Sequence, residues 1–151
     1  MSDENCSTRK IALQSLHHSI IITTRFSDTD AMQIVWHGNY LKYFEDGREA
    51  FGSFYGIRYM DMYANGFTAP IVHLEIDYKR SVSFNQPIRV DVTLKDTPAS
   101  KLIFQYAIYN HLTNELLCEG KTIQVFLNLS GELQLTNPEF FLEWKRKHGL
   151  L

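Results

Sequence analysis

The sequence has little of what marks several classes of protein. Its two cysteines, Cys6 and Cys118, lie far apart and show neither a CxxC pair nor any other metal-type spacing. No apolar run approaches the roughly 18 residues of a membrane helix, and the N-terminus lacks the apolar stretch of a signal peptide. A disulfide scaffold, a metal site, a secreted protein and a membrane span are therefore not expected. A cytoplasmic protein with reduced thiols is expected instead.

The sequence also has no large excess of positive or negative charge. Fifteen Lys and Arg residues stand against 17 Asp and Glu residues, a formal net charge of −2, so nothing in the composition favours binding to nucleic acid. Aromatic residues, by contrast, are plentiful, with 10 Phe and 8 Tyr, which favours a well-filled core or an interface. The length fits one domain. We interpret residues 1–17 as a polar leader and residues 18–151 as a single domain.

The first half of the domain predicts a strand and then a long helix. Residues 19–26 are rich in β-branched side chains, which is typical of a strand. Over residues 38–55 the apolar side chains recur at three- and four-residue steps, which indicates a helix that ends at Gly56. Gly47 inside this helix is unfavourable for helix formation, so we expect it to pack closely on a sheet.

The second half predicts strands and a last helix. After a short helical segment over residues 59–65, apolar and polar residues alternate with a period of two over residues 71–79 and 88–95, as in half-buried strands. Residues 102–109 are apolar on both faces, which is typical of a central strand, and residues 116–129 predict a further long strand. Residues 136–149 predict a C-terminal helix with Thr136 or Asn137 as its cap and Pro138 as its first residue. The expected class is α+β, one antiparallel sheet wrapped on one helix.

The connection before the long helix holds the residues best suited to chemistry. Asp28 and Asp30 are separated by one residue, and His37 follows Asp30 by seven positions, where the helix begins. Two close carboxylates can shift each other's pKa, and a carboxylate can serve as a base or a nucleophile. The first amides of a helix lack internal partners and can bind an oxygen that gains negative charge. The pattern also fits an ordinary turn, and Trp36 would suit either a pocket wall or the core.

The stretch DTDAMQIVWHGNYLKYFEDGREAF resembles the signature of the hotdog-fold acyl-CoA thioesterases. It is most similar to the branch that contains 4-hydroxybenzoyl-CoA thioesterase and the YbgC-like enzymes. The matching positions are Asp28, Asp30, Ala31, Val35, Trp36, His37, Asn39, Tyr40, Phe44, Glu45 and Arg48. The resemblance covers roughly residues 18–130. It implies a hotdog fold, an antiparallel β-sheet wrapped around one long central helix, which the C-terminal helix follows here.

The resemblance also implies roles for individual residues. Asp30 matches the catalytic carboxylate, which acts as nucleophile or general base on the thioester, and the backbone amide of His37 matches the group that polarises the thioester carbonyl. The His37 side chain is expected to cap the helix rather than to place the substrate. The substrate-binding positions implied are Trp36, Ala69, Ile71, Val72 and His73 along the acyl and pantetheine channel, and Ser100 and Lys101 at the CoA phosphates.

Active sites of this fold lie between subunits, so the resemblance implies a homodimer or a dimer of dimers, which would be a homotetramer. The substrate implied is an acyl-CoA or acyl-carrier-protein thioester. No cofactor is implied, because CoA is part of the substrate and product. Met32 and Gln33 stand where this branch often has glycine, a residue that permits a positive φ and a close approach of substrate.

Several alternatives stay open. Other branches of the fold carry the catalytic carboxylate on the helix, where this chain has Glu45 and Asp46. The fold also hosts non-catalytic proteins that bind acyl-CoA or acyl-carrier-protein thioesters, and a fold alone does not imply an activity. A dehydratase is a further possibility, although its His/Asp motif is not found. The acyl group can be aromatic or a short or medium aliphatic chain.

Overall fold

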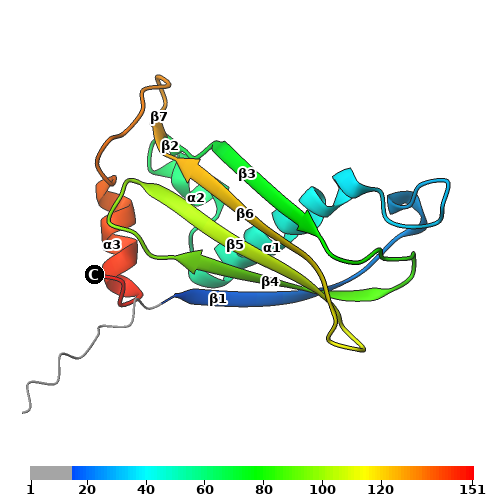
Figure 1. Ribbon diagram of the computed structural model, residues 1–151. Coiled ribbons are helices and arrows are strands. Elements are labelled where there is room, and N and C mark those ends of the chain that lie inside the picture. The colour runs from blue at the N-terminus through cyan, green and yellow to red at the C-terminus, as the bar shows by residue number, and fades with distance from the viewer. Residues whose placement is uncertain (1–14) are drawn as a thin grey trace, which may run out of the picture.

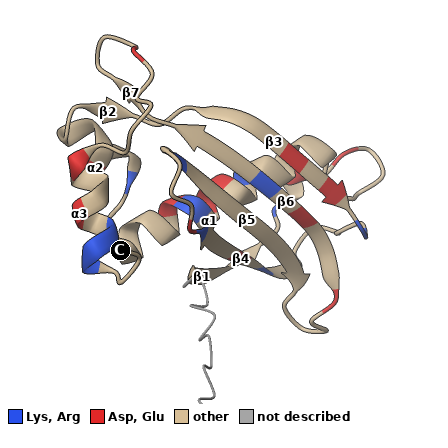
Figure 2. Cartoon of the chain, turned by 60° about the vertical axis from the view of Figure 1, so that its left-hand side comes forward, with Lys and Arg blue, Asp and Glu red and all other residues tan. Residues whose placement is uncertain are grey.

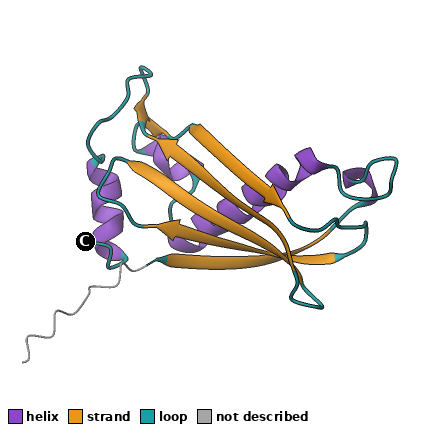
Figure 3. Ribbon diagram, viewed as in Figure 1, coloured by secondary structure: helices purple, strands orange, loops and turns teal. Residues whose placement is uncertain are grey.

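The computed structural model describes residues 15–151, in which five strands form one antiparallel sheet (Figure 1). The order across the sheet is β1 (Leu16–Thr23), β4 (Pro87–Lys95), β5 (Lys101–Asn110), β6 (Leu116–Val125) and β3 (Ile71–Tyr78). The long helix α1 (Tyr40–Tyr55) lies against one face of this sheet (Figure 3). The predicted α+β class and architecture are confirmed.

Helix α1 is held close to the sheet by glycine. A side chain at Gly47 would place its Cβ 2.8 Å from Val92 Cγ2 and 2.9 Å from Val90 Cγ1, so the expected close packing at this residue is found. Gly56 ends the helix with a φ of 75°, which glycine adopts without steric cost. Phe44 is fully buried beneath the sheet.

Smaller elements complete the fold. They are the 3-10 helices η1 (Phe26–Asp28) and η2 (His37–Asn39), the helices α2 (Tyr59–Ala64) and α3 (Glu139–Lys147), and a two-stranded sheet of β2 (Phe67–Thr68) and β7 (Leu127–Asn128). Helix α3 packs on the end of α1, where the indole N–H of Trp144 donates a hydrogen bond of 2.8 Å to the Tyr55 carbonyl. No helix in residues 15–151 has the length and apolar character that crossing a membrane requires.

The first strand begins and ends three residues earlier than predicted. β1 pairs with β4 from Leu16, opposite Leu94, to Thr23, opposite Pro87. Regular strand pairing ends at Thr23 because β4 starts at Pro87. Thr24 bonds instead to the turn before β4: its amide donates to the Gln86 carbonyl at 3.0 Å, and its carbonyl accepts from the Asn85 amide at 2.8 Å. Phe26 lies instead in η1 with 72% of its surface exposed. The predicted leader of residues 1–17 lies mostly outside the described residues, as does Cys6, but its last residues belong to β1.

Two further predicted boundaries are wrong. The single strand expected over residues 116–129 is interrupted at the fully buried Phe126, after which the chain leaves the main sheet to form β7 with β2. Neither Thr136 nor Asn137 caps the last helix. Pro138 is itself the cap residue of α3, with extended ψ of 146°, and the Asn137 amide donates to the carbonyl of Pro98 at 3.4 Å.

Strand β3 forms an edge of the sheet. Within residues 15–151 it pairs only with β6, so its other side has no strand beside it. Its apolar residues are left uncovered, with Val72 60% and Leu74 41% exposed. Exposed apolar edge strands readily accept a further strand, so this edge is the natural place for a second chain to pair.

Candidate active site

The loop between β1 and α1 is tied to the helix through Asp28. One oxygen of its carboxylate accepts hydrogen bonds from the Arg25 amide at 3.0 Å and the Tyr43 hydroxyl at 2.9 Å. Its backbone carbonyl accepts from the Trp36 amide at 3.0 Å and the Asn39 side chain at 2.8 Å. Burial, followed by the bond to Asp28, raises the pKa of Tyr43, which keeps its hydroxyl a donor. Asp28 therefore holds the loop against the helix.

Asp30 lies in a tight turn that satisfies one side of its carboxylate. Its Oδ1 accepts a hydrogen bond of 2.8 Å from the Met32 amide, and its backbone carbonyl accepts one of 2.9 Å from the Gln33 amide. Its Oδ2 has no hydrogen-bond partner among residues 15–151. The turn fixes the carboxylate while one oxygen stays available to attack a carbonyl or to take a proton.

Gln33 occupies a position at which the resembling branch often has glycine. Its φ of 63° lies in the left-handed region, which glycine adopts freely and which costs other residues energy. The loop thus keeps the backbone conformation that glycine favours, although the residue is glutamine. Met32, at the neighbouring position, is exposed.

The start of the helix leaves a free amide at His37. The two nearest backbone carbonyls are both hydrogen-bonded: the Trp36 carbonyl accepts from the Asn39 amide at 2.9 Å, and the His37 carbonyl accepts from the Tyr78 hydroxyl at 2.7 Å. The His37 N–H itself has no acceptor among residues 15–151. It is therefore available, at the positive end of the helix dipole, to an oxygen that gains charge.

The expected capping role of the His37 side chain is wrong. The cap residue of η2 is Trp36, with no side-chain cap bond, and the exposed imidazole of His37 makes no hydrogen bond with residues 15–151. The chain enters α1 through the 3-10 turn, so the His37 ring stands outside the turn and packs against the Trp36 ring at a centroid distance of 4.8 Å.

A cavity of about 300 Å³ brings Asp30 and His37 together. Tyr40 and Tyr78 form its aromatic wall, and Lys79 contributes a positive charge at the end of β3. A carboxylate with a free oxygen and a helix-start amide with a free hydrogen are the two groups that acyl transfer needs. The structure thus joins the two residues predicted to be catalytic.

The helix carboxylates lie elsewhere. Glu45 and Asp46 line a separate cavity of about 350 Å³, together with Arg48 and Gln124. Neither Asp30 nor His37 lines it. A carboxylate on the helix would therefore lack the free helix-start amide within the same cavity.

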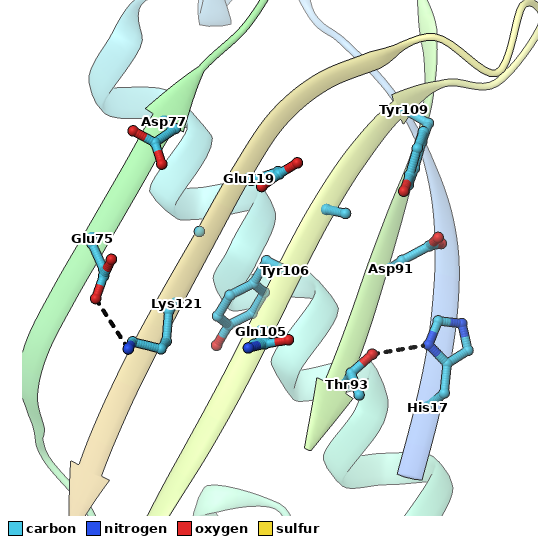
Figure 4. A pocket seen from close by; sticks show the side chains of 12 residues that line it. His17, Glu75, Asp77, Asp91, Thr93, Gln105, Tyr106, Tyr109, Glu119 and Lys121 are labelled. Carbon is cyan, nitrogen blue, oxygen red and sulfur yellow. Dashed lines mark hydrogen bonds and ion pairs between the residues drawn. The ribbon is translucent and has the colours of Figure 1, made fainter. Parts of the chain in front are cut away.

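A further hollow, of about 440 Å³, lies on the face of the sheet that is turned away from α1 (Figure 4). Charged residues of β3 and β6 line it, and Figure 2 shows acidic residues on β3 and both signs on β6. Glu75 pairs with Lys121 at 3.1 Å and with His73 at 3.0 Å, and these bonds, that of His73 first, lower the pKa of Glu75. None of its lining residues lies at the start of a helix, so it lacks a free helix-start amide such as that of His37.

Apart from Trp36, the predicted substrate-binding residues lie at the other end of β3. Ala69 is buried, and its carbonyl accepts a hydrogen bond of 2.6 Å from Gln124. In the sheet register Ile71 lies opposite Gln124 and Lys101 opposite Val125, and Ser100 precedes Lys101. The Asp30 cavity lies at the Tyr78 end, and the 8 residues of β3 span roughly 25 Å.

A single chain therefore does not bring these residues to Asp30. None of Ala69, Ile71, Val72, His73, Ser100 and Lys101 lines the cavity. Trp36 does not line it either: its ring, 49% exposed, lies over Gly38, where an added Cβ would meet it. Sequence reasoning missed Tyr78, although an aromatic residue ending an alternating strand was a visible signal. Within residues 15–151 no group of three His, Cys, Asp or Glu side chains is placed to hold a metal ion.

Comparison with known proteins gives a consistent result. Residues 24–145 match the Thioesterase-like superfamily. The chain is 36% identical over 89 residues to YneP of Bacillus subtilis, covering 59% of this chain and 64% of that protein. It is 25% identical over 119 residues to a 1,4-dihydroxy-2-naphthoyl-CoA hydrolase of Microcystis aeruginosa, covering 78% of this chain and 85% of that one. The alignment with YneP thus spans just under two thirds of that relative.

Solved structures share the fold. The DHNA-CoA thioesterase of Staphylococcus aureus superposes with a TM-score of 0.78 at 25% identity, covering 88% of this chain and 89% of that one. A 4-hydroxybenzoyl CoA thioesterase superposes with a TM-score of 0.73 at 17% identity, covering 85% of this chain and 97% of that one. The arrangement of strands around one long helix is therefore the one found in both of these proteins.

Proposed function

The chain belongs to the thioesterase-like superfamily and has its hotdog fold, and on that basis we propose that it hydrolyses an acyl-CoA thioester. Asp30 is the catalytic carboxylate, and the N–H of His37 binds the thioester carbonyl oxygen. The observation that carries the proposal is the cavity that both residues line, because Asp30 has a free carboxylate oxygen and His37 has a free helix-start amide. The names of the Staphylococcus and Microcystis relatives support the same class of substrate.

Two routes are compatible with this geometry. In the first, Asp30 takes a proton from water as the water oxygen attacks the thioester carbon. In the second, the Asp30 oxygen itself attacks, the CoA thiolate leaves, and water then hydrolyses the acyl anhydride. In both, the carbonyl oxygen gains a negative charge that the His37 N–H stabilises, and the C–S bond breaks to release CoA, whose sulfur ends protonated. Neither route requires a cofactor.

The substrate-binding residues join the site only in a dimer. If β3 of two copies pair antiparallel along their free edges, the start of one β3 lies beside the end of the other. The predicted channel of Ile71, Val72 and His73 in one copy then meets the Asp30 cavity of its partner. The exposed apolar side chains of β3 support this pairing. We therefore propose a homodimer in the cytoplasm, and the dimer of dimers stays a prediction.

The test replaces Asp30 by Asn, which retains an oxygen to accept the Met32 amide but can neither attack nor take a proton. Release of CoA thiol from aryl, short-, medium- and long-chain acyl-CoAs measures turnover. We expect Asp30→Asn to lower kcat/KM by about 1,000-fold without lowering the melting temperature. Glu45→Gln and Asp46→Asn are the matched controls, and we expect them to retain most of the activity.

Each alternative function predicts a different result in these experiments. Full activity in Asp30→Asn together with inactivity of Glu45→Gln or Asp46→Asn would move the catalytic carboxylate to the helix. Tight binding of acyl-CoA by the unmodified protein without any thiol release would indicate a binding protein instead. The same panel, repeated with acyl-carrier-protein thioesters, separates the two carriers, and its kcat/KM values identify the acyl group.

A further inference from the structure

Tyr78 joins the edge of the sheet to the start of the catalytic helix. It is the last residue of β3, and its hydroxyl donates a hydrogen bond of 2.7 Å to the carbonyl oxygen of His37. Its ring meets the Tyr40 ring edge-on at a centroid distance of 5.1 Å and the His37 ring at 6.3 Å. It also lines the cavity that contains Asp30. One side chain thus touches both the helix start and the cavity.

The bond acts on a peptide unit next to the free amide. His37 lies between two peptide units, and the carbonyl of each is hydrogen-bonded: that of Trp36 by the Asn39 amide, and that of His37 by Tyr78. The His37 N–H belongs to the same planar peptide unit as the Trp36 carbonyl, so the Asn39 bond fixes its plane directly. The Tyr78 bond fixes the next peptide unit and so holds His37 from its other side. The Asn39 bond belongs to the local turn, whereas the Tyr78 bond comes from a distant strand.

The strand end that carries Tyr78 is anchored, and the Tyr78 hydroxyl stays protonated. The amides of Lys79 and Arg80 both donate to the Leu117 carbonyl, at 2.9 and 3.1 Å. Burial, and then the nearby Cys118 thiol, raise the pKa of Tyr78 above its ordinary value. The hydroxyl consequently keeps its proton, and with it the capacity to donate, throughout the neutral range.

We propose that Tyr78 is a positioning residue that aims the His37 amide at the thioester carbonyl. Donors to an oxyanion act only when they are held within about 0.5 Å of the productive geometry, and the bond from β3 supplies that constraint from outside the helix. Because β3 is also one of the two edges of the sheet within residues 15–151, the same strand would pair with a second copy and hold the oxyanion donor in place. This role depends on the proposed thioesterase activity.

A structural role and a positioning role predict different kinetics. If Tyr78 serves only to fill space, its ring is what matters, and removing the hydroxyl changes neither the rate nor the affinity. If it contacts one acyl group, the loss depends on that group. A positioning role acts on the carbonyl that all thioesters share, so the loss falls on kcat by the same factor for every acyl group.

The test is Tyr78→Phe, which removes the hydroxyl and keeps the ring. We expect kcat to fall about tenfold, less than the loss of a direct oxyanion donor, by the same factor across the acyl-CoA panel and with KM within about twofold. Tyr63→Phe is the matched control, since this exposed tyrosine in α2 makes no hydroxyl hydrogen bond with residues 15–151, and its kcat should equal that of the unmodified protein. Melting temperatures of both variants are measured in parallel.

The outcomes separate this inference from the proposed function. Unchanged kcat in Tyr78→Phe, a loss that varies with the acyl group, or a change confined to KM would each overturn the positioning role and leave the thioesterase intact. If the unmodified protein releases no thiol from any thioester, the proposed function fails and the role of Tyr78 fails with it. A fall in kcat accompanied by an equal fall in the folded fraction would also count against positioning.

Discussion

At the scale of the residue, the Asp30 loop depends on a backbone angle that its own residue disfavours. Gln33 adopts a φ of 63°, which costs an L residue roughly 1 to 2 kcal/mol. The hydrogen bonds of the turn offset that cost, because the Gln33 amide donates to the Asp30 carbonyl and the Asp30 amide to the Ile34 carbonyl, both at 2.9 Å. A strained backbone angle of this kind persists where several surrounding contacts hold it in place.

Two substitutions at Gln33 measure this strain. Gln33→Gly relieves it but makes the unfolded chain more flexible, so we expect the free energy of unfolding to change by less than about 1 kcal/mol. Gln33→Val adds a β-branched side chain at positive φ and should lower it by about 2 kcal/mol. Urea unfolding checks both. Equal midpoints for the two variants would show that the turn does not hold this angle in solution.

At the scale of the element, the sequence predicts best what its own periodicity determines. Helix α1 and the strands β3, β4 and β5 lie within about two residues of their predicted bounds, because each repeats its apolar pattern over several turns or pairs. The end of β1 and the break at Phe126 depend on which strand lies alongside, and no local pattern encodes that. The same holds for the site: the resemblance supplied Asp30 and the His37 amide, whereas Tyr78 reaches His37 only through tertiary structure.

Helix α2 offers a test of pH dependence at this scale. The Asp61 carboxylate caps the helix by accepting the Arg58 amide at 2.8 Å, and hydrogen bonding from the Arg58 side chain lowers the pKa of Asp61. A lowered pKa in the folded state means that the charge stabilises the fold above the unfolded pKa and loses this effect as the pH falls. We expect Asp61→Asn to melt at a lower temperature at pH 7, and the difference to shrink as the pH falls from about 4 through the lowered pKa of Asp61.

Thermal unfolding between pH 3 and pH 7 gives this comparison directly. Glu132→Gln serves as the control, since this exposed carboxylate forms no ion pair among residues 15–151. A melting difference for Asp61→Asn that stays constant down to pH 3 would mean that the charge of Asp61 contributes nothing.

At the scale of the whole molecule, the two halves of the predicted site lie at opposite ends of one strand. Asp30 and His37 line a cavity near Tyr78, while Ser100 and Lys101 lie at the end where β3 begins. No local motion in a compact domain closes such a distance. The division is expected if each active site draws on two chains, as proposed above.

Mixing two impaired variants tests this division. Asp30→Asn lacks the carboxylate, and Lys101→Glu places a negative charge where the CoA phosphates are expected. In a mixed dimer one site combines the intact Asp30 of one chain with the intact Lys101 of the other, so random exchange of subunits should restore about a quarter of the unmodified activity. Co-expression with two affinity tags isolates the mixed dimer. Activity no higher than the mean of the two parents would place both residues in the site of one chain.

The position of Trp36 over Gly38 also has a spectroscopic consequence. The chain has two tryptophans: Trp36 is half-exposed beside the proposed catalytic amide, and Trp144 is buried in the core with its indole N–H bonded to Tyr55. Indole fluorescence shifts to longer wavelength in water, so the two emit at different wavelengths. We expect a ligand that binds at the helix start to change the red component, and unfolding to shift the blue one to longer wavelength. The unlabelled protein thus reports separately on its site and its core.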